Sequence, residues 1–214
     1  MRRRLFVFSL IFVVGLGAFA ITPPRGARSM REFDSVRMAD LELAMWQSYY
    51  AKERVRLFAL LVTTLHEQYH YSWAEATREG FHLARAAARF ADLEGRYDTV
   101  LPDLEQAYSR ARDWMRAGFD PHAVARAELA WWVARRDPRQ NSTEHVGRLI
   151  AEEYSLLYEA PIERVARAAL LRAEAARLRD EGAPRPDWEQ VGSLLRASYR
   201  ALLIGLNERY ARAA

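Results

Sequence analysis

From residue 29 onward, apolar residues recur every three or four positions, which is the period of an α-helix with one buried face. The clearest stripe lies near the end of the chain. It consists of Trp188, Val191, Leu195, Tyr199, Leu202 and Leu206. No segment is convincing as a β-strand, so the pattern predicts an all-α domain over residues 29–214.

Capping residues divide this domain into about six or seven helices. Ser72 and Glu75 form a capping box before a helix that runs through Phe90. Asp120 is a typical N-cap, and Pro121 follows it at the first helical position. The helices after Phe90 are predicted at residues 98–115, 121–136, 141–158, 161–182 and 187–206. Because the connections are short, we expect an antiparallel helical bundle.

The first helix of the domain is expected to be long and central. Two capping signals can start it, at Ser29 and at Asp34, and no Gly or Pro follows before Tyr71. Apolar residues cover most of its circumference, which is typical of a helix surrounded by other helices. A straight helix of this length would extend about 60 Å, so a bend around residues 52–56 is also expected.

The N-terminal segment indicates a connection to a membrane. Residues 5–21 form a nearly unbroken apolar run behind three arginines, at the short limit for a membrane-spanning helix. The Ala-Phe-Ala sequence at residues 18–20 also fits the cleavage site of a signal peptide, and both interpretations carry the following chain across the membrane. We expect an uncleaved transmembrane signal-anchor helix at residues 1–22 and a linker at residues 23–28. The domain would then lie on the periplasmic side of a bacterial-type inner membrane.

The positive net charge of the chain comes from this segment. The chain holds 32 Lys and Arg and 28 Asp and Glu, but five of the arginines lie in the first 28 residues, which contain no acid. The remaining chain is nearly neutral, with both signs mixed along its helices. Because a nucleic-acid-binding protein needs a basic face, we expect no nucleic acid partner. The absence of cysteine excludes disulfides and thiolate metal ligands.

Residues 66–70 read His-Glu-Gln-Tyr-His, a pattern with catalytic chemistry attached. On a helix, His66 and His70 share one face and can bind one zinc ion, with Glu67 beside them as general base. The five residues resemble the H-E-x-x-H motif of the zincin metalloproteases, which implies a zinc hydrolase. No third zinc ligand follows at the spacing of the metzincins or of the thermolysin-like enzymes.

A second metal hypothesis uses two E-x-x-H motifs, Glu67 with His70 and Glu79 with His82. Such pairs on facing helices resemble the di-iron sites of ferritin-like proteins. If the chain turns back after residue 71, the metal ligands His66, His70, Glu79 and His82 converge. Candidates for the further carboxylates are Glu128, Glu152 and Glu153. Histidine and glutamate near a helix end are also common as solvated or capping residues.

Residues 128–136 carry a further pattern of acidic, aromatic and basic side chains on one helix. One interpretation is a groove for a partner or cofactor, with an aromatic floor and a polar rim. The other is a core tryptophan, a groove-lining tryptophan and a solvated ion pair. The candidate interaction residues are Glu128, Trp131, Trp132, Arg135 and Arg136.

Together these patterns favour a membrane-anchored helical protein without catalysis or cofactor, which serves as an accessory or scaffold subunit of a larger protein complex. Six Trp and ten Tyr support this hypothesis, because such residues are enriched at protein interfaces. The alternative is a metal-dependent enzyme, either a zinc hydrolase at residues 66–70 or a di-iron protein that also uses Glu79 and His82.

Overall fold

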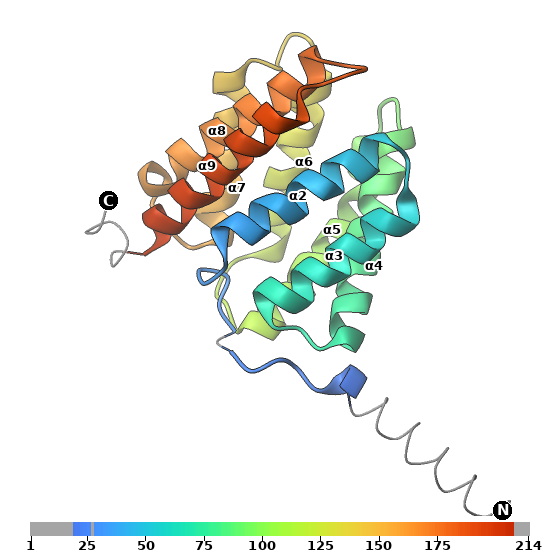
Figure 1. The fold of residues 1–214 in the computed structure, drawn as a ribbon, viewed down its shortest axis with the longest axis vertical. Coiled ribbons are helices and arrows are strands. Elements are labelled where there is room, and N and C mark those ends of the chain that lie inside the picture. The colour runs from blue at the N-terminus through green and yellow to red at the C-terminus, as the bar shows by residue number, and fades with distance from the viewer. Residues whose placement is uncertain (1–18, 27, 208–214) are drawn as a thin grey trace, which may run out of the picture.

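The computed structural model describes residues 19–26 and 28–207. Residues 35–206 form eight α-helices, with a short 3-10 helix before α5 (Figure 1). The helices are α2 (Ser35–Tyr50), α3 (Arg54–Tyr69), α4 (Trp73–Asp92), η1 (Tyr97–Val100), α5 (Leu101–Met115), α6 (Pro121–Arg136), α7 (Thr143–Leu157), α8 (Ile162–Glu181) and α9 (Trp188–Leu206). No strand occurs in the described residues, so the all-α prediction is confirmed.

The predicted capping residues begin several of these helices. The Asp34 side chain accepts hydrogen bonds from two backbone N–H groups of the first turn of α2. Ser72 accepts one such hydrogen bond at α4, from Glu75 N–H, and Asp120 accepts one at α6, from His122 N–H. Each cap satisfies N–H groups that have no partner inside the helix. The other predicted start, Ser29, lies before the helix.

The prediction of a long central first helix is wrong. α2 ends at Tyr50, the chain reverses, and α3 runs back beside it. Lys52 takes a φ of 59°, in the left-handed region, although neither Gly nor Pro marks this turn. The reversal, at residues 51–53, overlaps residues 52–56, where a bend is expected from the sequence. Val55, which lies directly after the turn, is 84% exposed, so the apolar surface expected for one continuous helix does not continue through the turn.

The eight helices close into a ring. Each helix packs against its neighbours in sequence, and α9 also packs against α2. Because consecutive helices run in opposite directions, α2, α4, α6 and α8 all end on one side of the ring (Figure 1). We call this side the mouth end and the opposite side the closed end. α3, α5, α7 and α9 end at the closed end.

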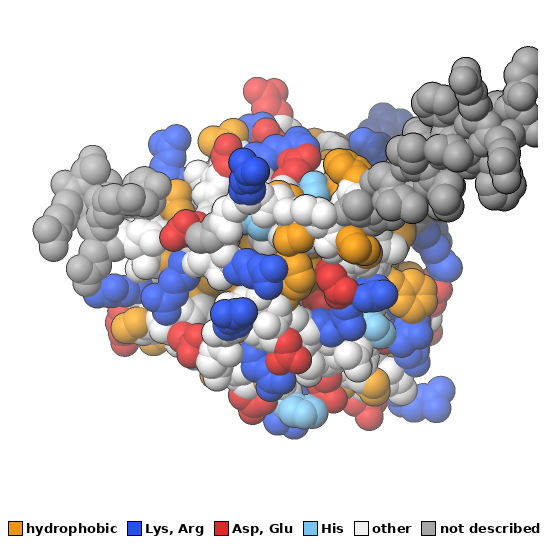
Figure 2. Space-filling model, turned by 90° about the horizontal axis from the view of Figure 1, so that it is seen from below, with side chains coloured by type: hydrophobic (Ala, Val, Ile, Leu, Met, Phe, Trp, Pro, Cys, Tyr) orange, Lys and Arg blue, Asp and Glu red, His pale blue; other side chains and the backbone are white. Residues whose placement is uncertain are grey.

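Residues 28–33, the N-terminal strap, cross the closed end. The guanidinium of Arg28 lies 4.0 Å from the centre of the Trp114 ring, and Met30 packs into the core. Arg31 donates hydrogen bonds to the carbonyl oxygens of Tyr158 and Glu159 at the end of α7. The strap therefore joins α5 and α7 across the end of the ring. Figure 2 shows this side of the molecule, where acidic and basic side chains are interspersed.

Within residues 19–26 and 28–207, no helix combines the length and the apolar composition that crossing a membrane requires. Most of the predicted anchor at residues 5–21 lies outside the described residues.

Candidate functional site

The ring of helices surrounds a cavity of about 640 Å³. Each of the eight α-helices contributes side chains to its wall, and Met30 of the strap lines it at the closed end. At the mouth end the lining includes the exposed residues Arg136 and Asp180, so the cavity reaches the surface there. A volume of this size is typical of a site for a small organic molecule.

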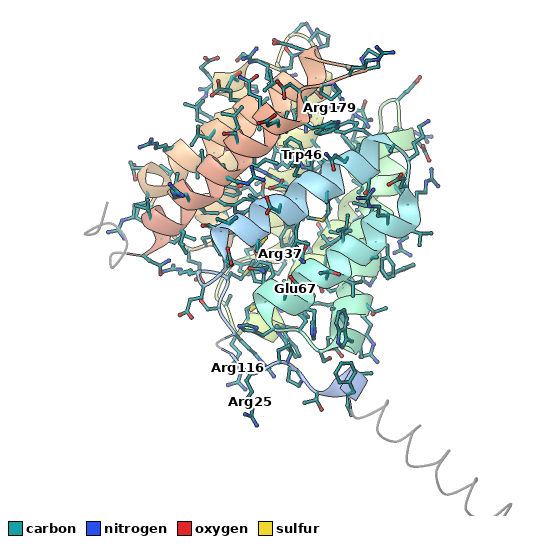
Figure 3. The ribbon with its side chains drawn as sticks, viewed as in Figure 1. Arg25, Arg37, Trp46, Glu67, Arg116 and Arg179 are labelled. Carbon is teal, nitrogen blue, oxygen red and sulfur yellow. The ribbon has the colours of Figure 1, made fainter. Side chains whose placement is uncertain are left out.

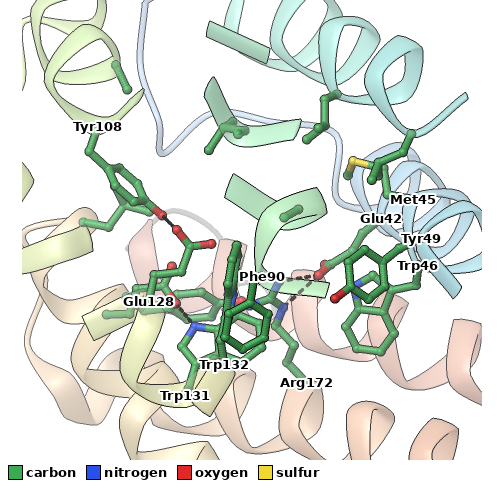
Figure 4. A pocket seen from close by; sticks show the side chains of 18 of the residues that line it. Glu42, Met45, Trp46, Tyr49, Phe90, Tyr108, Glu128, Trp131, Trp132 and Arg172 are labelled. Atoms are coloured by element: carbon green, nitrogen blue, oxygen red, sulfur yellow. Dashed lines mark hydrogen bonds and ion pairs between the residues drawn. The ribbon is translucent and has the colours of Figure 1, made fainter. Parts of the chain in front are cut away.

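Aromatic side chains form much of the wall. Trp132 of α6 packs against Phe90 of α4, with their ring centres 5.0 Å apart (Figure 4). Trp46 of α2 lies near the mouth, where Figure 3 also shows Arg179. The tyrosines of the wall are Tyr49, Tyr50, Tyr69, Tyr71, Tyr108, Tyr154, Tyr158 and Tyr199.

Three carboxyl groups and one guanidinium group meet inside the cavity, and we call them the carboxylate cluster: Glu42, Glu128, Glu153 and Arg172. Glu42 is 3% exposed, and its Oε1 accepts a hydrogen bond from Arg172 Nε at 2.9 Å. The second oxygen of Glu42, Oε2, accepts no hydrogen bond from any described residue. The cluster joins α2, α6, α7 and α8 (Figure 4).

Neutral donors hold the other two carboxyl groups of the cluster. The hydroxyl group of Tyr108 donates to Glu128 Oε2 at 2.8 Å, and Trp131 Nε1 donates to Glu153 Oε2 at 2.6 Å. Burial, together with the nearby charge of Glu128, raises the pKa of Glu153, and burial raises the pKa of Glu128. Both groups therefore bind a proton up to a higher pH than an exposed glutamate does, although the charge of Arg172 opposes this shift.

Glu79 of α4 is a fourth acidic side chain on the wall and is 2% exposed. Its Oε2 lies 3.6 Å from Arg110 Nε, but no described residue donates a hydrogen bond to it. Arg110 makes a closer contact with Glu75, at 2.5 Å. Burial raises the pKa of Glu79 to about 8, against the opposing effect of Arg110.

Two of the three arginines at the mouth pair with Asp180. Arg135 Nη2 lies 2.9 Å from Asp180 Oδ2, and Arg179 Nη1 lies 3.0 Å from Asp180 Oδ1. Arg136 donates to the carbonyl oxygen of Leu93 at 2.9 Å and stacks over Phe90. The three arginines occupy the last turns of α6 and α8, where the helix dipole favours positive charge.

The five candidate interaction residues of α6 all line the cavity: Glu128, Trp131, Trp132, Arg135 and Arg136. The expected aromatic floor and polar rim thus face the inside of the ring and not an outer groove. A role for these residues in binding stays a prediction.

The predicted metal ligands are distributed over separate sites. His66 Nδ1 lies 2.7 Å from the carbonyl oxygen of Tyr71, to which it donates as the Nδ1–H tautomer, and the ring stacks on Trp73. His70 ends α3 with a left-handed φ of 54°. His82 faces Asp103 at 3.5 Å.

Two further residues of the metal hypotheses point elsewhere. Glu67, the candidate base, is exposed and forms an ion pair of 2.8 Å with Arg37 (Figure 3). Glu79 faces the cavity. Among residues 19–26 and 28–207, no group of three or more His, Asp or Glu side chains is placed to hold a metal ion.

Sequence reasoning missed Glu42 and Arg172 and considered Glu153 only as a metal ligand. A signal was nevertheless present, because these charged residues occupy positions in phase with an apolar stripe. Glu153 lies three residues after Ile150 and four before Leu157, both of which are buried. A charged residue at such a position faces the interior, where it needs a partner or a cavity.

The chain matches no protein-family model, no curated protein and no solved structure.

Proposed function

We propose that this protein binds a small amphipathic molecule inside its ring of helices and does not act on it chemically. The observation that carries this proposal is the cavity of about 640 Å³, which has an aromatic wall and polar groups at a few fixed positions. Apolar walls provide affinity, and a few polar groups fix the orientation of a ligand.

A cavity of this kind lowers the stability of the fold, and a bound ligand would compensate for that loss. Filling the interior with apolar side chains would add packing contacts, and replacing buried carboxyl groups would remove a desolvation penalty. Glu42 and Glu79 each keep a carboxylate oxygen without a hydrogen bond from any described residue, at 3% and 2% exposure. Groups of this kind are expected where a ligand completes the hydrogen bonding.

The accessory or scaffold role that the sequence suggests is compatible with a ligand-binding ring and stays a prediction. The metal-dependent alternative finds no support in the placement of its candidate ligands. Binding is the function that the geometry supports best.

Fluorescence titration with a neutral apolar dye, phenylnaphthylamine, tests the proposal. Ala87 lines the cavity from α4, so Ala87→Phe places a ring inside it. We expect this variant to weaken dye binding by about tenfold or more, because the added ring takes the volume the dye needs. Ala130 is exposed on α6 and does not line the cavity, so Ala130→Phe is the matched control and should bind like wild type. Wild-type affinity in Ala87→Phe, or no dye binding to the wild-type protein, would contradict the proposal.

A further inference from the structure

Away from the mouth, the acidic groups of the cavity wall outnumber the basic ones. The wall carries the carboxyl groups of Glu42, Glu79, Glu128 and Glu153. Of the cations beside them, Arg172 pairs with Glu42, and Arg110 lies closer to Glu75 than to Glu79. Within residues 19–26 and 28–207, neither Glu128 nor Glu153 forms a salt bridge. The interior therefore holds carboxyl groups that no cation of the described residues pairs with.

The unpartnered polar atoms of the interior carboxylates point to the same kind of ligand. The Oε2 atoms of Glu42 and Glu79 are hydrogen-bond acceptors, and both side chains are more than nine-tenths buried on the cavity wall. An acceptor is completed by a donor, and an ammonium group brings up to three N–H donors together with a positive charge. A ligand carboxylate at this depth would instead face four carboxyl groups.

The aromatic wall suits a cation that is attached to an apolar body. Trp132 lies half-buried beside Glu128 on the same face of α6, one turn away. Arg172 already lies over the Trp131 ring at 4.8 Å, which shows that the wall accommodates a cation on an aromatic face. Another helix of the ring, α3, contributes the apolar residues Leu57, Leu61 and Leu65 to the wall. A ligand can thus place a cation on the α6 side and a hydrocarbon body against α3.

The arginines at the mouth make contacts with other groups of the protein. Asp180 pairs with both Arg135 and Arg179, and Arg136 is bound to a backbone carbonyl group. The C-terminal ends of α2, α4, α6 and α8, each with negative partial charge, gather at the same end. Arg135 Nε and Arg179 Nε have no hydrogen-bond partner among the described residues, so an anionic head group would bind at the mouth and not beside the four carboxyl groups of the interior.

We propose that the molecule held in this cavity is an organic amine, whose protonated nitrogen binds between Glu128 and Glu153 and whose apolar body packs against the aromatic and aliphatic wall. This inference rests on the proposed binding function and names the class of ligand. The two carboxyl groups are faced by Tyr108 from α5, Glu42 from α2 and Arg172 from α8. Binding of the cation favours the ionised carboxylates, so protons are released on binding.

Three probes with one body and different head groups test the inference: phenylbutylamine, phenylbutanol and phenylbutyrate. Isothermal titration calorimetry of the full-length protein at about pH 8 should show the amine binding at least about tenfold more tightly than the alcohol or the acid. Titrations in two buffers of different ionisation enthalpy should show proton release with the amine and none with the alcohol.

The variant Glu128→Gln/Glu153→Gln keeps both hydrogen-bond acceptors and removes both charges. It should lose most of the preference for the amine while it binds the alcohol like wild type, which also shows that it is folded. Glu67→Gln, on the outside of the ring, is the control and should keep the preference. Equal or tighter binding of the alcohol or the acid would overturn the amine inference and leave the binding function in place. A failure of phenylnaphthylamine to bind would instead remove the binding function itself.

Discussion

At the residue scale, the buried acidic residues of the cavity wall lower the free energy of unfolding. Glu79 is 2% exposed and Glu153 is 4% exposed. Removing an ionised carboxylate from water costs free energy that a distant arginine does not fully restore. These residues are therefore expected to be retained for binding at the expense of stability.

Replacing Glu79 by Gln should change the pH dependence of unfolding. The pKa of Glu79 in the folded protein is about 8 and its ordinary value is 4.5, so between these values the folded state holds a proton that the unfolded state has lost. The free energy of unfolding therefore falls as the pH rises through this window. Urea denaturation should show Glu79→Gln close to wild type at about pH 5 and more stable by about 3 to 4 kcal/mol at pH 8.

The control for this experiment is Glu67→Gln, which replaces an exposed carboxylate outside the cavity. Its pH profile should run parallel to that of the wild-type protein. A parallel profile for Glu79→Gln as well would show that Glu79 is ionised at neutral pH in the folded protein.

At the scale of the elements, the reversal at Lys52 distinguishes the observed pair of helices, α2 and α3, from the single long helix that the sequence predicts. Lys52 has a φ of 59°, where a side chain is unfavourable and glycine is not. We expect Lys52→Gly to be more stable than Lys52→Ala by about 1 kcal/mol in urea denaturation. In a continuous helix the order would be reversed by about the same amount. The sign of the difference therefore decides between the two arrangements.

The helix boundaries were predictable because they depend on local chemistry. Ser72 and Asp120 cap their helices whatever the tertiary arrangement is, because each cap and its N–H partner lie within one turn of the chain. A change of direction near Lys52 was predictable, but its size was not. The full reversal is imposed by packing, and no Gly or Pro marks it in the sequence. The contact of α2 with α9 joins opposite ends of the domain. A contact between segments so far apart in the chain cannot be predicted from the pattern of neighbouring residues in a single sequence.

The candidate site was predictable only in its α6 part. Glu128, Trp131 and Trp132 stood out because they are close in sequence. Their cavity partners Glu42 and Arg172 lie on α2 and α8, and their pairing depends on how the ring closes. The predicted metal ligands failed to converge for a related reason. His66 and His82 face different neighbours, although α3 and α4 do form the expected hairpin.

At the scale of the whole molecule, closure of the ring creates the cavity. Ala39 of α2 packs with Val191 and Leu195 of α9, and Arg196 Nη2 lies 2.8 Å from Asp40 Oδ1 outside them. The strap then covers one end, and the other end opens between the C-termini of four helices. Because the chain enters through the strap, a membrane anchor before it would place the closed end toward the bilayer and the mouth toward the solution.

This orientation is open to measurement because the chain has no cysteine. Asp113 is an exposed residue near the closed end, at the end of α5, and Asn141 is an exposed residue beside the mouth end, in the connection from α6 to α7. Full-length Asp113→Cys and Asn141→Cys proteins would be labelled with a fluorophore and reconstituted in vesicles that contain a quencher lipid. We expect the label at residue 113 to be quenched more strongly than the label at residue 141, since residues 5–21 are predicted to hold the closed end near the bilayer. Equal quenching would argue against this orientation, and release of the protein from membranes by alkaline carbonate would argue against the anchor itself.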